Sequence, residues 1–206
     1  METAKQLWAG NEDLAEACLE HPFVQGIADG SLARTSFQIY VGQDAFFLEA
    51  FARAYALALA KSPDRAGMTQ FKDLVLGVFD ELTLHEKYAQ RWAIDLAPEP
   101  LPATRAYTDF LLSTAGLEPV GHIAAAMTPC MRLYAWLGQT LKPHASTESP
   151  YYEWIETYSD AGLETLVQGL EALLDHYGGT PDRIAQLYRT AMRLELGFFE
   201  SAWRAV

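Results

Sequence analysis

Long helix-favouring segments divided by short breaks constrain this chain more than any other feature. Segments rich in Ala, Leu, Glu and Gln run for about 15 to 30 residues between breaks that contain Pro or Gly. No run of alternating apolar residues is flanked by hairpin turns, so no sheet is predicted. We therefore predict helices over residues 4–20, 36–61, 65–94, 103–115, 119–141, 151–158, 161–177 and 181–203.

These helices predict an all-α, single-domain bundle over residues 1–206. The length of 206 residues fits one domain, half of the residues are hydrophobic, and the chain contains no internal repeat or interdomain linker. Short connections favour antiparallel neighbours. Thr180 is predicted as a helix N-cap, with Pro181 at the first helical position.

The charge balance excludes several classes of protein. The chain has 15 Lys and Arg against 27 Asp and Glu, a net charge of −12, and no basic run. Binding to nucleic acid or to anionic membranes is therefore disfavoured. The first 21 residues lack the basic and apolar regions of a signal peptide, and no stretch approaches the ~20 apolar residues of a membrane span. Cys18 and Cys130 are too far apart for a CxxC motif, which favours free thiols in a reducing cytoplasm.

Asp44 is the first candidate for chemistry. It precedes Phe47, Leu48 and Phe51 by three, four and seven residues on one helix face, and a carboxylate among aromatic side chains is costly unless it is paired. A functional carboxylate is one reading. The other is a helix position near an end or in a partly solvated groove.

Cys130 is the second candidate. Pro129 lies inside a helical stretch, where it removes a backbone hydrogen bond and is expected to kink the helix. Tyr134 follows Cys130 by one turn on the same face. The kink could open a cavity and direct the thiol into it, although a free cysteine is more commonly a small buried side chain, as we expect for Cys18.

Glu195 is the third candidate. It shares a helix face with Phe198 and Phe199, where a carboxylic acid can keep its proton near neutral pH and act as a general acid. The alternative is a solvated carboxylate on an exposed stripe, as expected for Glu200.

The histidines do not suggest a metal or haem site. Glu81 and His85, like Glu118 and His122, are four residues apart, whereas di-iron bundles use Glu-x-x-His. The first pair is predicted to form a hydrogen bond along one helix face. His21 precedes Pro22 at a helix end and is predicted to be structural or capping. No phosphate-binding glycine loop is present.

Seven segments in order resemble the TenA/thiaminase II family, within the haem-oxygenase-like helical fold. The resemblance covers about residues 5 to 205 and rests on the following segments: HPFVQGIADGSL, YVGQDAFFLEAFARAYA, ELTLHEKYA, AYTDFLLSTA, AAMTPCMRLYAWLG, SPYYEWIETYSDAGLE and ELGFFESAW.

The resemblance implies an aminopyrimidine aminohydrolase. Members convert 4-amino-5-aminomethyl-2-methylpyrimidine to the hydroxymethyl pyrimidine and ammonia in thiamin salvage, and some also cleave thiamin. It further implies no metal or haem and a cytoplasmic homotetramer.

Residues carried over from the resemblance divide into catalytic and substrate-binding groups. Cys130 matches the nucleophile and Glu195 the carboxylate near a ring nitrogen and the leaving group. Asp44 matches the carboxylate that holds the pyrimidine amine. The matching aromatic positions are Tyr107, Tyr134, Tyr158 and Phe47, the last of which is commonly Tyr in the family. This departure puts the rate or the preferred substrate in doubt.

A mechanism and two alternatives follow. Glu195 would protonate the ring, Cys130 would add to the carbon beside the substituted one, the methylene would expel ammonia or thiazole, and water would then add. Asp44 would orient the ring, either through two points if one oxygen carries a proton or through the amine alone.

One alternative is a non-catalytic pyrimidine-binding or regulatory protein, which Phe47 favours. The other is a haem or redox enzyme of the same fold, which would need His and Glu ligands that the sequence lacks.

Overall fold

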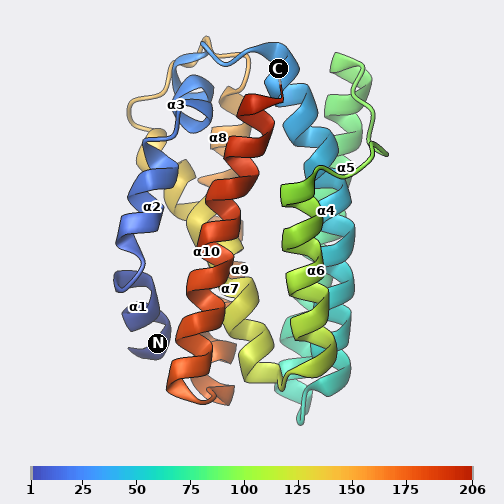
Figure 1. The fold of residues 1–206 in the computed structure, drawn as a ribbon, viewed down its shortest axis with the longest axis vertical. Coiled ribbons are helices and arrows are strands. Elements are labelled where there is room, and N and C mark those ends of the chain that lie inside the picture. The colour runs from blue at the N-terminus through green and yellow to red at the C-terminus, as the bar shows by residue number, and fades with distance from the viewer. Residues whose placement is uncertain (1, 206) are drawn as a thin grey trace.

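Long helices run side by side along the longest axis of the molecule. The computed structural model describes residues 2–205. Figure 1 shows the helices of the bundle, with the N-terminus towards one end and the C-terminus at the other. Within the described residues the helices are α1 (Glu2–Ala9), α2 (Glu12–Leu19), α3 (Pro22–Asp29), α4 (Arg34–Lys61), α5 (Arg65–Trp92), α6 (Pro102–Leu117), α7 (Val120–Leu141), α8 (Tyr152–Tyr158), α9 (Ala161–Tyr177) and α10 (Pro181–Arg204).

The all-α prediction is confirmed, and most helix limits agree with it to within two residues. No strand occurs between residues 2 and 205. Helix α7 continues through Pro129. Thr180 occupies the predicted N-cap position of α10, but its side chain makes no capping hydrogen bond.

The predicted helix over residues 4–20 is wrong in one respect, because it is two helices. The Asn11 side-chain amide donates to the Leu7 carbonyl at 2.7 Å, and the Asn11 backbone N–H bonds to Trp8. An Asn side chain can compete with the helical hydrogen-bond ladder in this way. The chain therefore breaks at Gly10–Asn11 and begins α2 at Glu12.

Helix α3 was not predicted, although its signals are in the sequence. His21 ends one helix and caps the next, since its Nδ1 accepts a hydrogen bond from the Phe23 N–H at 3.1 Å. Pro22 occupies the first turn, and Gly30 ends the helix with a φ of 80°. The capping role predicted for His21 is confirmed, and its Nε2 also lies 2.8 Å from Glu200.

The core lies between two groups of helices. Helix α4 packs mainly against α5 and α6, and α7 packs mainly against α9 and α10. Gly138 lets α7 approach α8, because a Cβ atom there would lie 2.5 Å from the backbone carbonyl carbon of Tyr158. This close approach fixes the position of Tyr158 beside the core.

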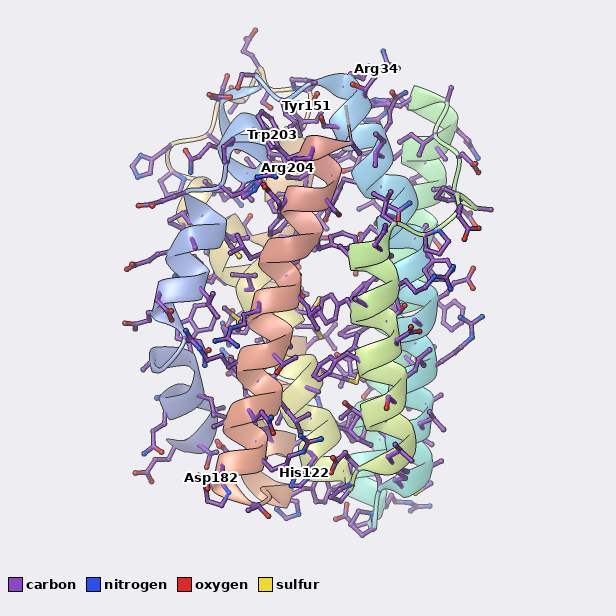
Figure 2. The ribbon with its side chains drawn as sticks, viewed as in Figure 1. Arg34, His122, Tyr151, Asp182, Trp203 and Arg204 are labelled. Carbon is purple, nitrogen blue, oxygen red and sulfur yellow. The ribbon has the colours of Figure 1, made fainter. Side chains whose placement is uncertain are left out.

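Aromatic side chains close one end of the bundle. The Tyr151 hydroxyl donates to the Leu32 carbonyl at 2.6 Å, and the Tyr151 ring lies 4.7 Å from that of Phe37. Arg34 lies over the Trp92 ring at 5.3 Å. Figure 2 places Tyr151, Arg34 and Trp203 at this end and His122 and Asp182 at the other. The candidate site lies between these ends, among the long helices.

No helix within residues 2–205 combines the length and the apolar character needed to cross a lipid bilayer.

Candidate functional site

An internal cavity lies among α4, α5, α7, α8 and α9. The space between its lining atoms, including the part that is open to solvent, is about 520 Å³. Five of the seven predicted site residues line it: Asp44, Phe47, Cys130, Tyr134 and Tyr158. The lining also includes Glu81 but no Lys or Arg.

Tyr107 and Glu195 lie behind this lining rather than in it. Both are buried, and the Tyr107 hydroxyl donates to Glu195 Oε1 at 2.6 Å. The Tyr107 ring also packs against Phe47, with 4.8 Å between ring centroids. Tyr107 thus connects the buried carboxyl on α10 to the aromatic wall on α4.

Glu195 and Cys130 form an acid–thiol pair. Burial raises the pKa of Glu195 to about 7, although hydrogen bonding from Tyr107 and Cys130 opposes the rise. Burial also raises the pKa of the Cys130 thiol, and the neighbouring Glu195, Glu81 and Asp44 carboxyls add to that rise. The thiol is therefore protonated in the free protein, beside a carboxyl that can exchange a proton near neutral pH.

Asp44 is paired across the bundle with His85, a partner that the sequence analysis missed. The His85 Nε2 lies 2.8 Å from Asp44 Oδ2, and both side chains are buried. The His85 Nδ1 lies 2.9 Å from the Glu81 backbone carbonyl, so each ring nitrogen faces an acceptor and donates to it. The imidazole is therefore an imidazolium ion paired with the Asp44 carboxylate.

The pKa of His85 agrees with this assignment. Burial lowers it, but the hydrogen bond and charge of Asp44, together with Glu81, raise it to about 9 overall. The predicted hydrogen bond between Glu81 and His85 is present, but His85 bonds to the Glu81 backbone carbonyl and not to its carboxyl. Its more consequential partner, Asp44, is 41 residues away in the sequence.

Glu81 is the second residue that the sequence analysis did not place in the site. Its Oε1 accepts a hydrogen bond from the Tyr158 hydroxyl. Burial and the nearby Asp44 raise the pKa of Glu81 to about 7, while His85 and Tyr158 oppose the rise. Two carboxyls therefore titrate close to neutral pH: Glu81 in the cavity lining and Glu195 behind it.

The remaining sulfur and histidine positions fit structural roles. Cys18 is fully buried, as predicted, and burial raises the pKa of its thiol. Glu200, predicted to face water, is 37% exposed at its side chain and pairs with His21 and Arg204. Within residues 2–205 no group of three or more His, Cys, Asp or Glu side chains converges as metal ligands do.

Comparison with known proteins identifies the family of this chain. The model of the TENA/THI-4/PQQC family matches residues 8–205. An aminopyrimidine aminohydrolase from Halalkalibacterium halodurans is 34% identical, over 98% of this chain and 96% of that protein. The mitochondrial bifunctional TH2 protein of Arabidopsis thaliana is also 34% identical, over 87% of this chain, which spans only 34% of that longer protein.

A solved structure agrees with the sequence relatives. A TenA family transcription regulator from a Silicibacter species superposes with a TM-score of 0.92 and 28% identity, covering 98% of this chain and 96% of that one. The expected haem-oxygenase-like helical fold is thereby confirmed. The fold, the order of its segments and the family match agree from residue 8 to residue 205, and this chain belongs to the TENA/THI-4/PQQC family.

Proposed function

We propose that this chain is an aminopyrimidine aminohydrolase of the thiaminase II type. It hydrolyses 4-amino-5-aminomethyl-2-methylpyrimidine to the hydroxymethyl pyrimidine and ammonia in thiamin salvage. The observation that carries this proposal is the Cys130 thiol at a cavity between two carboxyls, Glu195 beside it and Asp44 across the lining. Relatives named aminopyrimidine aminohydrolase support it at 34% and 27% identity.

The cavity fits a flat, uncharged or cationic heterocycle. Phe47, Tyr134 and Tyr158 supply aromatic faces in its lining. The absence of Lys and Arg from this lining disfavours phosphorylated pyrimidines, because a buried phosphate requires cationic or N–H partners. Thiamin, which presents the same pyrimidine with a thiazolium leaving group, is a second substrate of the same chemistry.

Asp44 holds the amine of the pyrimidine as a carboxylate. His85 occupies Oδ2, while Oδ1 takes no hydrogen bond from residues 2–205. An ionised Oδ1 can accept from the exocyclic amine but cannot donate to the adjacent ring nitrogen. Asp44 is therefore expected to bind the exocyclic amine alone, and not the amine and the ring nitrogen together.

The proton of the thiol leaves through Glu195. At neutral pH a fraction of Glu195 is ionised, and it accepts the Cys130 proton as sulfur bonds to the ring carbon beside the substituted one. Glu195 passes this proton to the ring nitrogen next to that carbon, which receives the displaced electron pair. The addition removes aromaticity from the ring and leaves its amine conjugated with the substituted carbon.

The amine then drives the loss of the leaving group. Its lone pair forms a C=N bond, the ring electrons form an exocyclic C=C bond, and the C–N bond to ammonia breaks with its electron pair. Asp44 stabilises the positive charge that develops on the amine. Water adds to the exocyclic carbon, the electrons return to the ring, and the sulfur leaves with recovery of its proton through Glu195.

Ammonia release tests the proposal. Wild-type protein mixed with the aminomethyl pyrimidine should release ammonia, Cys130→Ser should lose the activity by about a thousandfold or more, and Cys18→Ala should retain it. Absence of ammonia from the wild type, or a Cys130→Ser variant as fast as wild type, would contradict the catalytic proposal.

A second candidate is a pyrimidine-binding protein without turnover, which Phe47 favours because no hydroxyl stands at that position near the thiol. Binding of the hydroxymethyl pyrimidine without any ammonia release from the aminomethyl substrate would identify it. Turnover that depends on Cys130 would eliminate it.

We also propose a cytoplasmic homotetramer acting as one domain over residues 1–206. The unpaired thiols of Cys18 and Cys130 fit a reducing compartment. An apolar groove between α4 and α5 includes Phe79, which is 57% exposed, and a second copy of the chain would cover it. Light scattering that gives the mass of a monomer would contradict the tetramer.

A further inference from the structure

Glu81 lies in a wall that two cavities share. A second, outer cavity lies between α5 and the α8–α9 region, and it shares Gly77, Glu81, Tyr158, Leu163 and Leu166 with the lining of the internal one. Glu81 therefore borders both cavities. The side chain is half-buried and reaches inward, since its carboxyl accepts from the buried Tyr158 hydroxyl.

The carboxyl of Glu81 shares the cavity lining with the two groups that act on the ring, Asp44 and Cys130. It interacts electrostatically with Asp44 and His85 and with the Cys130 thiol. Tyr158 fixes it by donating to Oε1, which leaves Oε2 without a hydrogen bond from residues 2–205. One oxygen of this carboxyl is thus anchored and the other is open to the cavity.

The chemistry of the ring directs its reacting substituent towards the space between Asp44 and Cys130. Asp44 holds the amine on one neighbour of the substituted ring carbon, and Cys130 attacks the neighbour on the other side. The substituent of the carbon between them points into the space between Asp44 and Cys130. Glu81 lines the same cavity as Asp44 and Cys130, and it also lines the outer cavity, from which water can reach it.

We propose that Glu81 is a catalytic base that faces the exocyclic methylene, pairs with the departing ammonium group and then deprotonates the attacking water. This inference rests on the proposed function and adds a residue to it. In the first step the Glu81 carboxylate holds the substrate ammonium while its C–N bond breaks and ammonia leaves with the bonding pair.

The second step is the addition of water. The water oxygen bonds to the exocyclic carbon, its proton passes to Glu81 Oε2, and the electrons of the exocyclic double bond return to the ring. Glu81 then gives this proton to the released ammonia. The sum of the two steps is the aminomethyl pyrimidine with a protonated side-chain amine, plus water, going to the hydroxymethyl pyrimidine and ammonium. The pKa of Glu81, near 7, suits a group that both accepts and returns a proton.

Glu81→Gln and Glu156→Gln form a matched pair of variants. Both remove one carboxylate from the lining of the outer cavity, but Glu156 is exposed and does not line the internal cavity. We expect Glu81→Gln to lower kcat by about 100- to 10,000-fold, as loss of a general base does. Glu156→Gln should keep kcat within about twofold. Affinity for the hydroxymethyl product, which carries no ammonium, should change less than about threefold in either variant.

Azide separates catalysis from a structural role of Glu81. Azide is a nucleophile that needs no deprotonation, so it should restore turnover to Glu81→Ala and yield the azidomethyl pyrimidine, detected by mass. It should not accelerate the wild type. A merely structural carboxyl would give no azide product, because no intermediate would form for azide to capture.

The outcomes distinguish this inference from the proposed function. A wild type that releases ammonia together with a Glu81→Gln variant of equal kcat overturns the role of Glu81 and leaves the proposed function intact. A slow Glu81→Gln variant whose product affinity collapses, with no azide product from Glu81→Ala, assigns Glu81 to structure and also overturns the inference. A wild type that releases no ammonia overturns both.

Discussion

Replacing Glu195 with Gln should stabilise the fold at alkaline pH while abolishing activity. The pKa of Glu195 rises from 4.5 to about 7, first because of burial and also because of the nearby Asp44 charge. The difference between the two pKa values corresponds to about 3 kcal/mol. This free energy is the cost of keeping an ionised carboxylate in the buried site.

The sign of the effect follows from linkage. The folded-state pKa lies above the unfolded value, so the folded state binds the proton more tightly. Its contribution to stability is full below pH 4.5 and is lost as pH rises through about 7. Glu195→Gln removes the ionisation but keeps the shape and the Oε1 acceptor for the Tyr107 hydroxyl. The variant should therefore gain stability over wild type only as pH rises through this window.

Thermal unfolding of the wild type and of Glu195→Gln across the pH range measures the difference in their stability. A gain of up to about 3 kcal/mol should raise Tm by several degrees at about pH 8.5, since 1 kcal/mol shifts Tm by about 2 to 4 °C at this size. Near pH 5 the two Tm values should nearly coincide. Comparison at each pH cancels the similar contribution of Glu81, which is present in both proteins.

Glu164→Gln is a control of opposite sign. Although burial raises the pKa of Glu164, hydrogen bonds from Arg132, Gln139 and Gln168 lower it overall. Its removal should destabilise the protein at neutral pH by about 1 kcal/mol. A Glu195→Gln variant that is no more stable than wild type at alkaline pH, or whose gain is the same at every pH, would refute the reasoning.

Two further variants test recognition and the aromatic wall. Asp44→Ala should weaken product binding by about 10- to 100-fold in equilibrium titration, because it removes an amine acceptor and leaves the His85 cation buried without its partner; unchanged affinity would remove the recognition role. Phe47→Tyr should raise or lower kcat by more than about threefold with the fold intact, since it adds a hydroxyl to a buried ring in the cavity lining; identical kinetics would show that the missing hydroxyl is without consequence.

The helices could be predicted because their signals are local. Pro102 and Pro181 begin helices, and the range 161–177 was predicted without error. The failures came from short-range competition that propensity does not describe. The Asn11 side chain breaks a run that otherwise favours helix. His21 was expected to have a structural or capping role, but the helix that it caps, α3, was not predicted.

The site could be predicted only where residues carried their own signal. Asp44 stood out among aromatic residues, and Cys130 followed an unusual proline. His85 carried a signal along its own helix, towards Glu81, but its partner on α4 depends on how α4 packs against α5. Contacts between distant segments leave no periodicity in one sequence, so the imidazolium–carboxylate pair could not be predicted.

The charges around the cavity explain why its two glutamic acids keep their protons near neutral pH. The buried His85 is already paired with Asp44, and neither Glu81 nor Glu195 has a cationic hydrogen-bond partner among residues 2–205. A Lys or Arg in the lining would neutralise the two glutamates and lower their pKa values, and with them the capacity to pass protons. A substrate with an ammonium or thiazolium group brings the missing cation itself. Its binding favours the ionised form of the carboxyl nearest to it, so substrate increases the fraction of the base that the hydrolysis needs.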